Sequence, residues 1–245
     1  MSTPDFSLII PLYNEEESVA ALAAEVESAL AGLDWECLWV DDGSRDGTAG
    51  CVRRLATAQP RHRLLRLARN CGQSAALLAG LDEARGRLLG TLDGDGQNDP
   101  ADLPRMIALQ RAGGADLVNG RRAVRRDSWL RRVSSRVANS WRNALTGESV
   151  ADVGCAIRVF RRECARHLPP FKGMHRFLPT LIRLDGWSLV ELEVAHRPRQ
   201  RGVSKYGVGN RLWVGILDTF GVMWLKRRHA HYQLATEDAP DGPNS

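Results

Sequence analysis

The sequence of 245 residues contains no apolar run long enough to cross a bilayer. A membrane-spanning helix needs about 20 consecutive, predominantly apolar residues. The longest candidate, 212–225, is shorter than this and carries Asp218. The first residues lead directly into the apolar stretch 6–10, so we expect no signal peptide. The sequence therefore predicts no helix that spans a membrane.

Patterns that would indicate disulfide or dinucleotide chemistry are also lacking. The cysteines are odd in number, and no pair has C-x-x-C spacing, which favours free thiols in a reducing compartment. No G-x-G-x-x-G follows the first apolar stretch, which argues against a dinucleotide-dependent oxidoreductase. The five cysteines are Cys37, Cys51, Cys71, Cys155 and Cys164.

Positively charged residues outnumber negatively charged ones, and the charges are unevenly distributed along the chain. The formal net charge is +5, with 43% hydrophobic and 26% charged residues, which is ordinary for a globular protein. The segment 121–142 is strongly basic, whereas the residues after Gln233 are acidic. A basic cluster indicates an anionic partner, such as a phosphate, a nucleic acid or a membrane surface.

Apolar, strand-like stretches alternate with helix-like stretches through the first half of the chain. Such alternation predicts an α/β fold with a mostly parallel sheet and helices on both faces. Strands are expected at 6–12, 35–40, 63–67, 87–92, 115–119, 154–160 and 188–195, and helices after Asn14, after Thr48, at 74–85 and at 102–112.

The first of these helices begins with a run of polar residues, Asn14 to Glu17. Asn14 is expected to cap it, because asparagine is a favoured N-cap residue. Glu17 lies three residues further on and would complete a capping box.

Polar motifs follow three of the expected strands at the point where each strand ends. They are Pro11-Leu12-Tyr13-Asn14-Glu15, Asp41-Asp42-Gly43-Ser44 and Asp93-Gly94-Asp95. Ligands of parallel α/β sheets bind at the carboxyl ends of the strands. Three motifs at three strand ends therefore predict a binding site at this edge.

The third motif has the composition of a metal site. Asp93 and Asp95 are separated by a glycine, and Gln97 follows them. Carboxylate and amide oxygens suit a hard cation such as Mg²⁺ or Mn²⁺, which also binds substrate phosphates. Asp93, Asp95 and Gln97 are therefore the candidate metal ligands.

These motifs, together with the basic loop from Arg199 to Lys205, resemble the family 2 glycosyltransferases. The resemblance is to the polyprenyl-phosphate branch, and it extends over about residues 6–206. It implies a GT-A fold and a nucleotide-sugar donor, either a GDP-sugar or a UDP-sugar. It also implies a divalent metal and inverting transfer of one sugar to a polyprenyl phosphate, with no nucleic acid involved.

The resemblance also implies roles for residues that match the family motifs. The donor base and ribose would contact Pro11, Tyr13, Glu15, Asp41 and Asp42, and Asp93 would bind metal and diphosphate. The acceptor phosphate would contact Arg121, Arg131 and Ser135. The catalytic residues would be Asp95 with Arg199, Ser204 and Lys205 of a mobile loop.

We expect four segments along the chain. Residues 1–120 would form the donor-binding core, and 121–206 would form the acceptor part with the catalytic loop. Residues 207–230 would form an amphipathic helix at a membrane interface, and 231–245 a disordered tail. The expected helix has tryptophans near both ends and the cations Lys226-Arg227-Arg228 at its C-terminal end, a pattern that suits attachment to an anionic bilayer. This predicts a peripheral enzyme at the cytoplasmic face of the inner or plasma membrane; a homo-oligomer is left open.

Two other functions compete with this prediction. A transferase that glycosylates a saccharide hydroxyl would need a carboxylate base, and Asp152 is a candidate. The Q-x-x-R-W signature of processive family members is absent, which weakens this alternative. A non-catalytic membrane- or nucleic-acid-binding protein would use the basic segment 121–142 but would leave the aspartate motifs unexplained.

Overall fold

The computed structural model describes residues 3–122, 150–197 and 208–229. Its strands are β1 (Phe6–Leu12), β2 (Trp35–Asp41), β3 (His62–Arg66), β4 (Leu88–Thr91), β5 (Leu117–Arg122), β6 (Arg158–Arg161) and β7 (Leu189–Val194). Its α-helices are α1 (Glu16–Ala29), α2 (Thr48–Ala58), α3 (Gln73–Glu83), α4 (Leu103–Arg111), α6 (Leu178–Leu184) and α7 (Val208–Arg228). Short 3₁₀ helices are η1 (Pro100–Asp102), η2 (Arg162–Ala165) and η3 (Met174–Arg176). The alternation predicted from the sequence is confirmed.

The described strands form one sheet in the order β3-β2-β1-β4-β6-β5-β7. Neighbouring strands are parallel, except that β6 runs antiparallel to both β4 and β5. The strand predicted at 154–160 begins only at Arg158, because a turn in which the Cys155 N–H donates to the Asp152 carbonyl precedes it. The mostly parallel sheet is confirmed.

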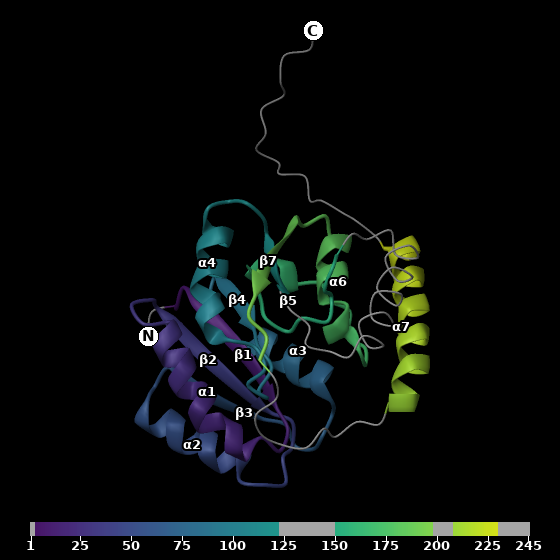
Figure 1. Cartoon of the computed structure of the whole chain (residues 1–245). Helices are drawn as coiled ribbons and strands as arrows, with labels where there is room; N and C mark the ends of the chain where they lie inside the picture. Colours follow the sequence, from purple (N-terminus) through teal and green to yellow (C-terminus); the bar gives the residue numbers. More distant parts are fainter. Residues whose placement is uncertain (1–2, 123–149, 198–207, 230–245) are drawn as a thin grey trace, which may run out of the picture.

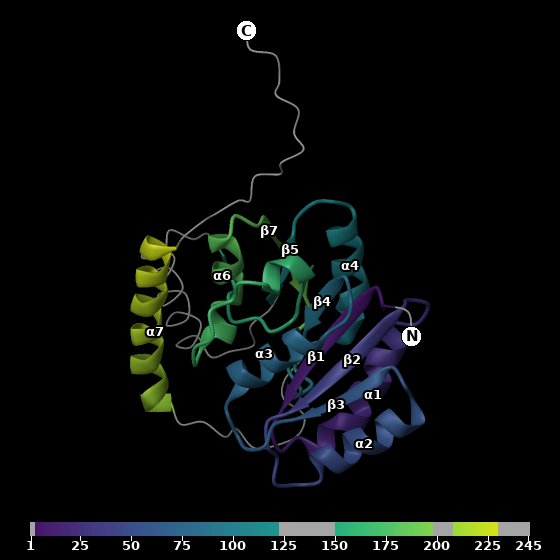
Figure 2. The ribbon, with the colours of Figure 1, turned by 180° about the vertical axis from the view of Figure 1, so that it is seen from behind.

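Helices cover both faces of this sheet. Side chains at alternate positions of β1 enter different cores: Leu8 and Ile10 pack with α1, α2 and α4, whereas Ile9 packs with α3, α6 and α7. Figure 1 shows α1, α2 and α4 in front of the sheet, and Figure 2 shows α3 and α6 on the opposite face. The period of two that places residues on alternate faces of a strand thus divides the apolar residues between two layers.

The predicted capping box at the start of α1 is wrong. Asn14 has a left-handed backbone (φ 51°), and its side-chain oxygen accepts from the backbone N–H of Arg45. Helix α1 begins at Glu16, and Glu15 in the N-cap position makes no side-chain capping bond. A contact with a distant loop therefore replaces the local cap that the sequence suggested.

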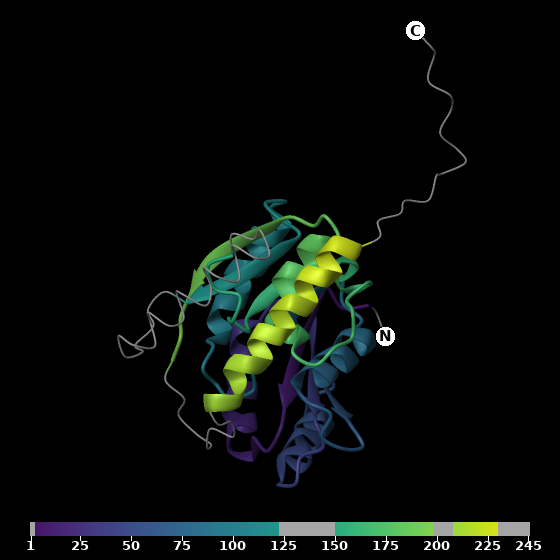
Figure 3. The same ribbon diagram turned by 90° about the vertical axis from the view of Figure 1, so that its right-hand side faces the viewer.

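Helix α7 runs along the outside of the molecule (Figure 3). Val222 and Thr219 are buried on its inner side, whereas Leu217, Phe220 and Trp224 are 68%, 51% and 61% exposed. No helix in the described part of the chain is long and apolar enough to cross a membrane.

Candidate functional site

The loops that follow β1 and β2 are bonded to each other at the carboxyl edge of the sheet. The backbone N–H of Asn14 donates to Ser44 Oγ at 2.9 Å, and that of Glu15 donates to Thr48 Oγ1 at 2.9 Å. The first two polar motifs therefore lie side by side, as predicted. Pro11, Tyr13 and Glu15 are partly exposed along this edge.

The two aspartates at the end of β2, Asp41 and Asp42, are both buried and have different partners. Asp41 Oδ1 accepts from the Ser44 N–H at 2.9 Å, and its Oδ2 lies 3.2 Å from Arg66 Nε. The carboxylate of Asp42 accepts from the backbone N–H groups of Cys71 and Gly72, at 2.7 and 2.9 Å. Asp42 therefore fixes the loop that precedes α3, while its contact with a donor stays a prediction.

Asp93 and Asp95 follow β4 at the same edge. Asp93 Oδ1 accepts from the side-chain amide of Gln73 at 2.8 Å, and Asp95 Oδ1 accepts from the backbone N–H of Gln97 at 3.1 Å. Loss of hydration and the nearby charge of Asp95 raise the pKa of Asp93 from its usual value of 3.8 to about 6. The charges of Arg158 and Arg122 offset part of this shift.

These properties fit a divalent cation. The charged form of Asp93 is disfavoured where it lies, and a cation between the two carboxylates would relieve both the desolvation and their repulsion. The described residues contain no group of three or more His, Cys, Asp or Glu side chains placed to bind a metal. A metal here would therefore take its remaining ligands from Gln97, phosphate oxygens and water, as Mg²⁺ commonly does.

We expect Asp93→Asn to raise the thermal stability of the metal-free protein at pH 8 and to raise it much less at pH 5. Because the folded pKa, about 6, exceeds the unfolded value, the folded state binds more protons in this window and its stability falls as pH rises. The substitution removes this cost, which is of the order of 1 kcal/mol for a partly exposed group. Melting curves in EDTA at both pH values measure the effect, and an equal change at both would contradict it.

Three residues near this site were not singled out from the sequence. They are Gln73, which orients Asp93, and two arginines, Arg122 and Arg158. Arg158 is 4% exposed, and its guanidinium donates to Asn119 Oδ1 at 3.1 Å and to the Val153 carbonyl at 2.9 Å. Strand register places Arg158 opposite Thr91 of β4, two positions before Asp93. Arg158 thus supplies a buried positive charge that favours the charged form of Asp93.

Asp152 is held by an arginine fork. Arg122 Nε donates to Asp152 Oδ2 at 2.6 Å and Arg122 Nη2 donates to Oδ1 at 2.7 Å. The backbone N–H of Asp152 donates to Glu191 Oε1 at 3.1 Å. A substrate hydroxyl would have to displace a bidentate guanidinium to reach this carboxylate, so the geometry does not favour Asp152 as a base.

Of the predicted acceptor and catalytic residues, the structure describes only Arg121 and Asp95. Arg121 lies near the carboxyl end of β5, and its exposed side chain pairs with Glu193 at 3.3 Å. Arg131, Ser135, Arg199, Ser204 and Lys205 lie outside the described residues, as does most of the basic segment 121–142.

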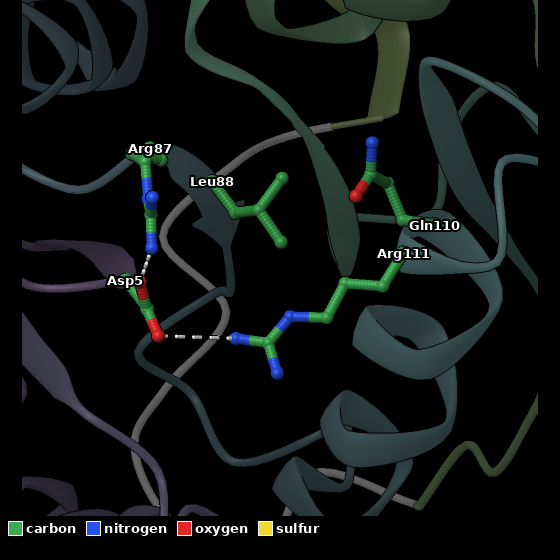
Figure 4. A pocket seen from close by; sticks show the side chains of 5 residues that line it. All are labelled: Asp5, Arg87, Leu88, Gln110 and Arg111. Carbon is green, nitrogen blue, oxygen red and sulfur yellow. Dashed lines mark hydrogen bonds and ion pairs between the residues drawn. The ribbon is translucent and has the colours of Figure 1, made fainter.

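A separate hollow of about 270 Å³ opens at the other edge of the sheet, where β1 and β4 begin (Figure 4). Asp5 lies between Arg87 and Arg111 and pairs with both, so the two cations already have an anionic partner. Leu88 and Gln110 complete the wall. This hollow does not belong to the site formed by the strand-end motifs.

The described part of the chain is a mostly parallel sheet with carboxylates at its strand ends, and comparison with known proteins gives the family. The sequence model of the protein family described as glycosyl transferase family 2 matches residues 7–168, which is more than half of the chain. The chain belongs to glycosyl transferase family 2.

Curated relatives confirm the predicted branch of this family. The chain is 38% identical over 232 residues to dodecaprenyl-phosphate galacturonate synthase of Rhizobium johnstonii, covering 92% of this chain and 68% of the relative. It is 37% identical over 203 residues to undecaprenyl-phosphate 4-deoxy-4-formamido-L-arabinose transferase of Proteus mirabilis, covering 82% of this chain and 62% of the relative. The chain thus spans about two thirds of the length of these relatives.

Solved structures confirm the GT-A fold. Glucosyl-3-phosphoglycerate synthase from Mycobacterium tuberculosis superposes with a TM-score of 0.69 at 18% identity, covering 91% of this chain and 80% of that one. A mannosyltransferase from Pyrobaculum calidifontis superposes with a TM-score of 0.62 at 19% identity, covering 95% of this chain and 66% of that one. At this identity the likeness concerns the fold alone.

Proposed function

We propose that this glycosyltransferase moves a sugar from a nucleotide-sugar donor to a polyprenyl phosphate, with inversion at the anomeric carbon. The observation that carries the proposal is the pair Asp93 and Asp95 at a strand end, in a chain whose curated relatives are named as polyprenyl-phosphate sugar transferases. The donor would lie along the carboxyl edge, with its nucleoside between the loop after β1 and the Asp41–Ser44 loop.

A divalent metal fits this proposal. The synthase with the same fold has been solved with Mn²⁺ and uridine diphosphate, and with Mg²⁺ and uridine diphosphate. In this chain Asp93, Asp95 and Gln97 would hold the cation, which would neutralise charge on the departing diphosphate. Gln73 keeps the Asp93 carboxylate oriented, and the charge of Arg158 favours the ionised form of Asp93.

The acceptor would be held by arginines. A phosphate is already anionic at neutral pH, so attack does not require a strong base, and the weak case for Asp152 as a base is consistent with this. Donor and acceptor are both anions and repel each other, so cations must lie near both. Arg121, Arg131 and Ser135 would position the acceptor phosphate, and Arg199, Ser204 and Lys205 would close on the donor side.

Arg131→Ala and Arg199→Ala are expected to reduce transfer to undecaprenyl or dodecaprenyl phosphate by about tenfold or more, since each removes a phosphate contact. Donor affinity should fall much less in Arg131→Ala, because that residue serves the acceptor. Product formation with a panel of UDP- and GDP-sugars, beside donor binding by calorimetry, tests both statements. An enzyme that ignores every polyprenyl phosphate yet glycosylates a free oligosaccharide would support the hydroxyl-transfer alternative instead.

The outer face of α7 suits the surface of a membrane that contains such a lipid. Leu217, Phe220 and Trp224 are spaced by three and four residues and so lie on one side of the helix, next to the cationic end Lys226-Arg227-Arg228. Apolar side chains beside cations are typical of helices that lie in an anionic bilayer interface. We propose peripheral attachment through this face.

Replacing Phe220 and Trp224 together by serine should therefore reduce flotation of the protein with vesicles containing phosphatidylglycerol by about tenfold or more. A matched control is Leu78→Ser together with Leu64→Ser, two partly buried apolar residues on other elements. The control should leave vesicle binding unchanged while lowering the melting temperature. Equal flotation of wild type and the α7 variant would remove this face from membrane attachment.

A further inference from the structure

Arg197 joins three segments that are far apart in the sequence. It follows β7, and its Nη1 donates to Glu25 of α1, at 3.0 Å to Oε1 and 2.9 Å to Oε2. Its Nη2 donates to Asp99 Oδ2 at 2.5 Å, in the segment between the aspartate pair and η1. The guanidinium thus ties the end of β7 both to a helix of the core and to the chain that leaves the metal-binding motif.

Backbone contacts run alongside this side-chain contact. The N–H of Arg197 donates to the Gln97 carbonyl at 2.8 Å, and Asn98 forms an isolated antiparallel bridge with His196. The N–H of Ala195 donates to Asp102 Oδ2 at 2.8 Å. Residues 195–197 are therefore bonded to residues 97–99 and to Asp102.

This anchoring matters because the preceding segment contains a glycine, the residue with the widest backbone freedom. Gly96 has a positive φ of 71°, and a Cβ placed there would meet nothing within 4 Å. The orientation of Asp95 depends on one described bond, from the Gln97 N–H at 3.1 Å. The glycine alone does not fix the Gln97 peptide, so contacts on the far side of Gln97 help to hold it in place.

We propose that Arg197 is a positioning residue for the metal site: it holds Gln97–Asp99 so that Asp95 and Gln97 keep the geometry that binds a divalent cation. The inference rests on the metal use proposed above. Glu25 is the fixed support, since it belongs to α1, whose inner face is part of the core. Arginine suits this task because its planar fork can bind two carboxylates at once.

A purely structural role would give a different result. The side chains of Arg197, Glu25 and Asp99 are 32%, 41% and 21% exposed, and ion pairs of such exposure contribute little to stability. The expected loss is therefore in metal affinity rather than in folding. Arg63 provides a matched control, because its guanidinium also bridges two carboxylates, Glu36 at 2.8 Å and Glu83 at 3.6 Å, on β3 away from the motif.

The experiment is calorimetry of the full chain with Mn²⁺ alone and with Mn²⁺ plus uridine diphosphate, beside melting curves in EDTA. Arg197→Ala should weaken Mn²⁺ binding by about tenfold, Arg197→Lys and Glu25→Gln by less, and Arg63→Ala should leave it at the wild-type value. The Mn²⁺ concentration for half-maximal transfer should rise in the same order.

The two proposals fail in different ways. Wild-type protein that binds neither Mn²⁺ nor Mg²⁺ would overturn the proposed metal use, and this inference with it. Wild-type binding with unchanged affinity in Arg197→Ala would overturn only the positioning role, as would an equal loss in Arg63→Ala. If Arg197→Ala does not fold, Glu25→Gln decides, because it removes the support and retains the Asp99 contact.

Discussion

Asp95→Ala is expected to abolish sugar transfer while leaving the fold intact. Asp95 is partly exposed and its described bond is local, to the Gln97 N–H, so no buried partner is lost with it. The rate should fall by about 10²-fold or more, because metal-assisted stabilisation of the departing diphosphate is worth several kcal/mol. Initial rates at saturating Mn²⁺, beside circular dichroism and melting curves, measure both parts of the statement.

Asp82→Ala is the matched control for this substitution. Asp82 is an exposed aspartate of α3, and its removal should change neither the rate nor metal binding. Chelation by EDTA should inactivate the wild type to the level of Asp95→Ala. Activity near the wild-type level in the variant, or in the wild type with EDTA, would rule out the metal assignment.

Gly43→Ala should damage the donor side of the site. Gly43 has a φ of 68°, and a Cβ there would lie 2.6 Å from the backbone carbon of Arg69 and 2.7 Å from the backbone nitrogen of Asn70. Neither atom belongs to a flexible side chain, so the loop that Asp42 holds through Cys71 and Gly72 must move. We expect a loss of about 2–3 kcal/mol in stability and most of the donor affinity.

Gly32→Ala separates the clash from the backbone strain. Gly32 has a comparable φ of 81°, but a Cβ there would meet nothing within 4 Å. This control should cost only about 1 kcal/mol and leave donor binding unchanged. Chemical denaturation and calorimetry with uridine and guanosine diphosphates compare the two variants. Equal effects on donor binding would show that the contact with the Arg69–Asn70 backbone is unimportant.

The sheet and the placement of the polar motifs at its carboxyl edge could be predicted because they depend on patterns that are local in sequence. Buried parallel strands are short apolar runs, and the polar motifs begin where the runs end, so 6–12 and 35–41 were found nearly to the residue. The predicted cap of α1 was wrong because the Asn14 side chain accepts a hydrogen bond from a loop about thirty residues away. Local propensity contains no information about such a contact.

The supporting residues of the site could not be predicted for the same reason. Gln73 reaches Asp93 from the start of a helix, Arg158 lies on a reversed strand, and Arg197 pairs with Glu25, 172 residues away. In the sequence, each is an ordinary polar residue near a strand or helix end. Only the tertiary arrangement distinguishes them from the many arginines that pair at the surface.

The reversed strand β6 also has a consequence for synthesis of the protein. When the first 122 residues have left the ribosome, β1 to β4 can pair, but β5 has neither of its neighbours, since β6 and β7 are still to come. During that interval β4 presents an open edge, and β5, in which Leu117 and Val118 are followed by polar residues, has no partner strand. Open edges of this kind pair readily with other chains. The nascent chain therefore keeps an open sheet edge until β6 has been translated, and a chaperone that binds such edges would act in that interval.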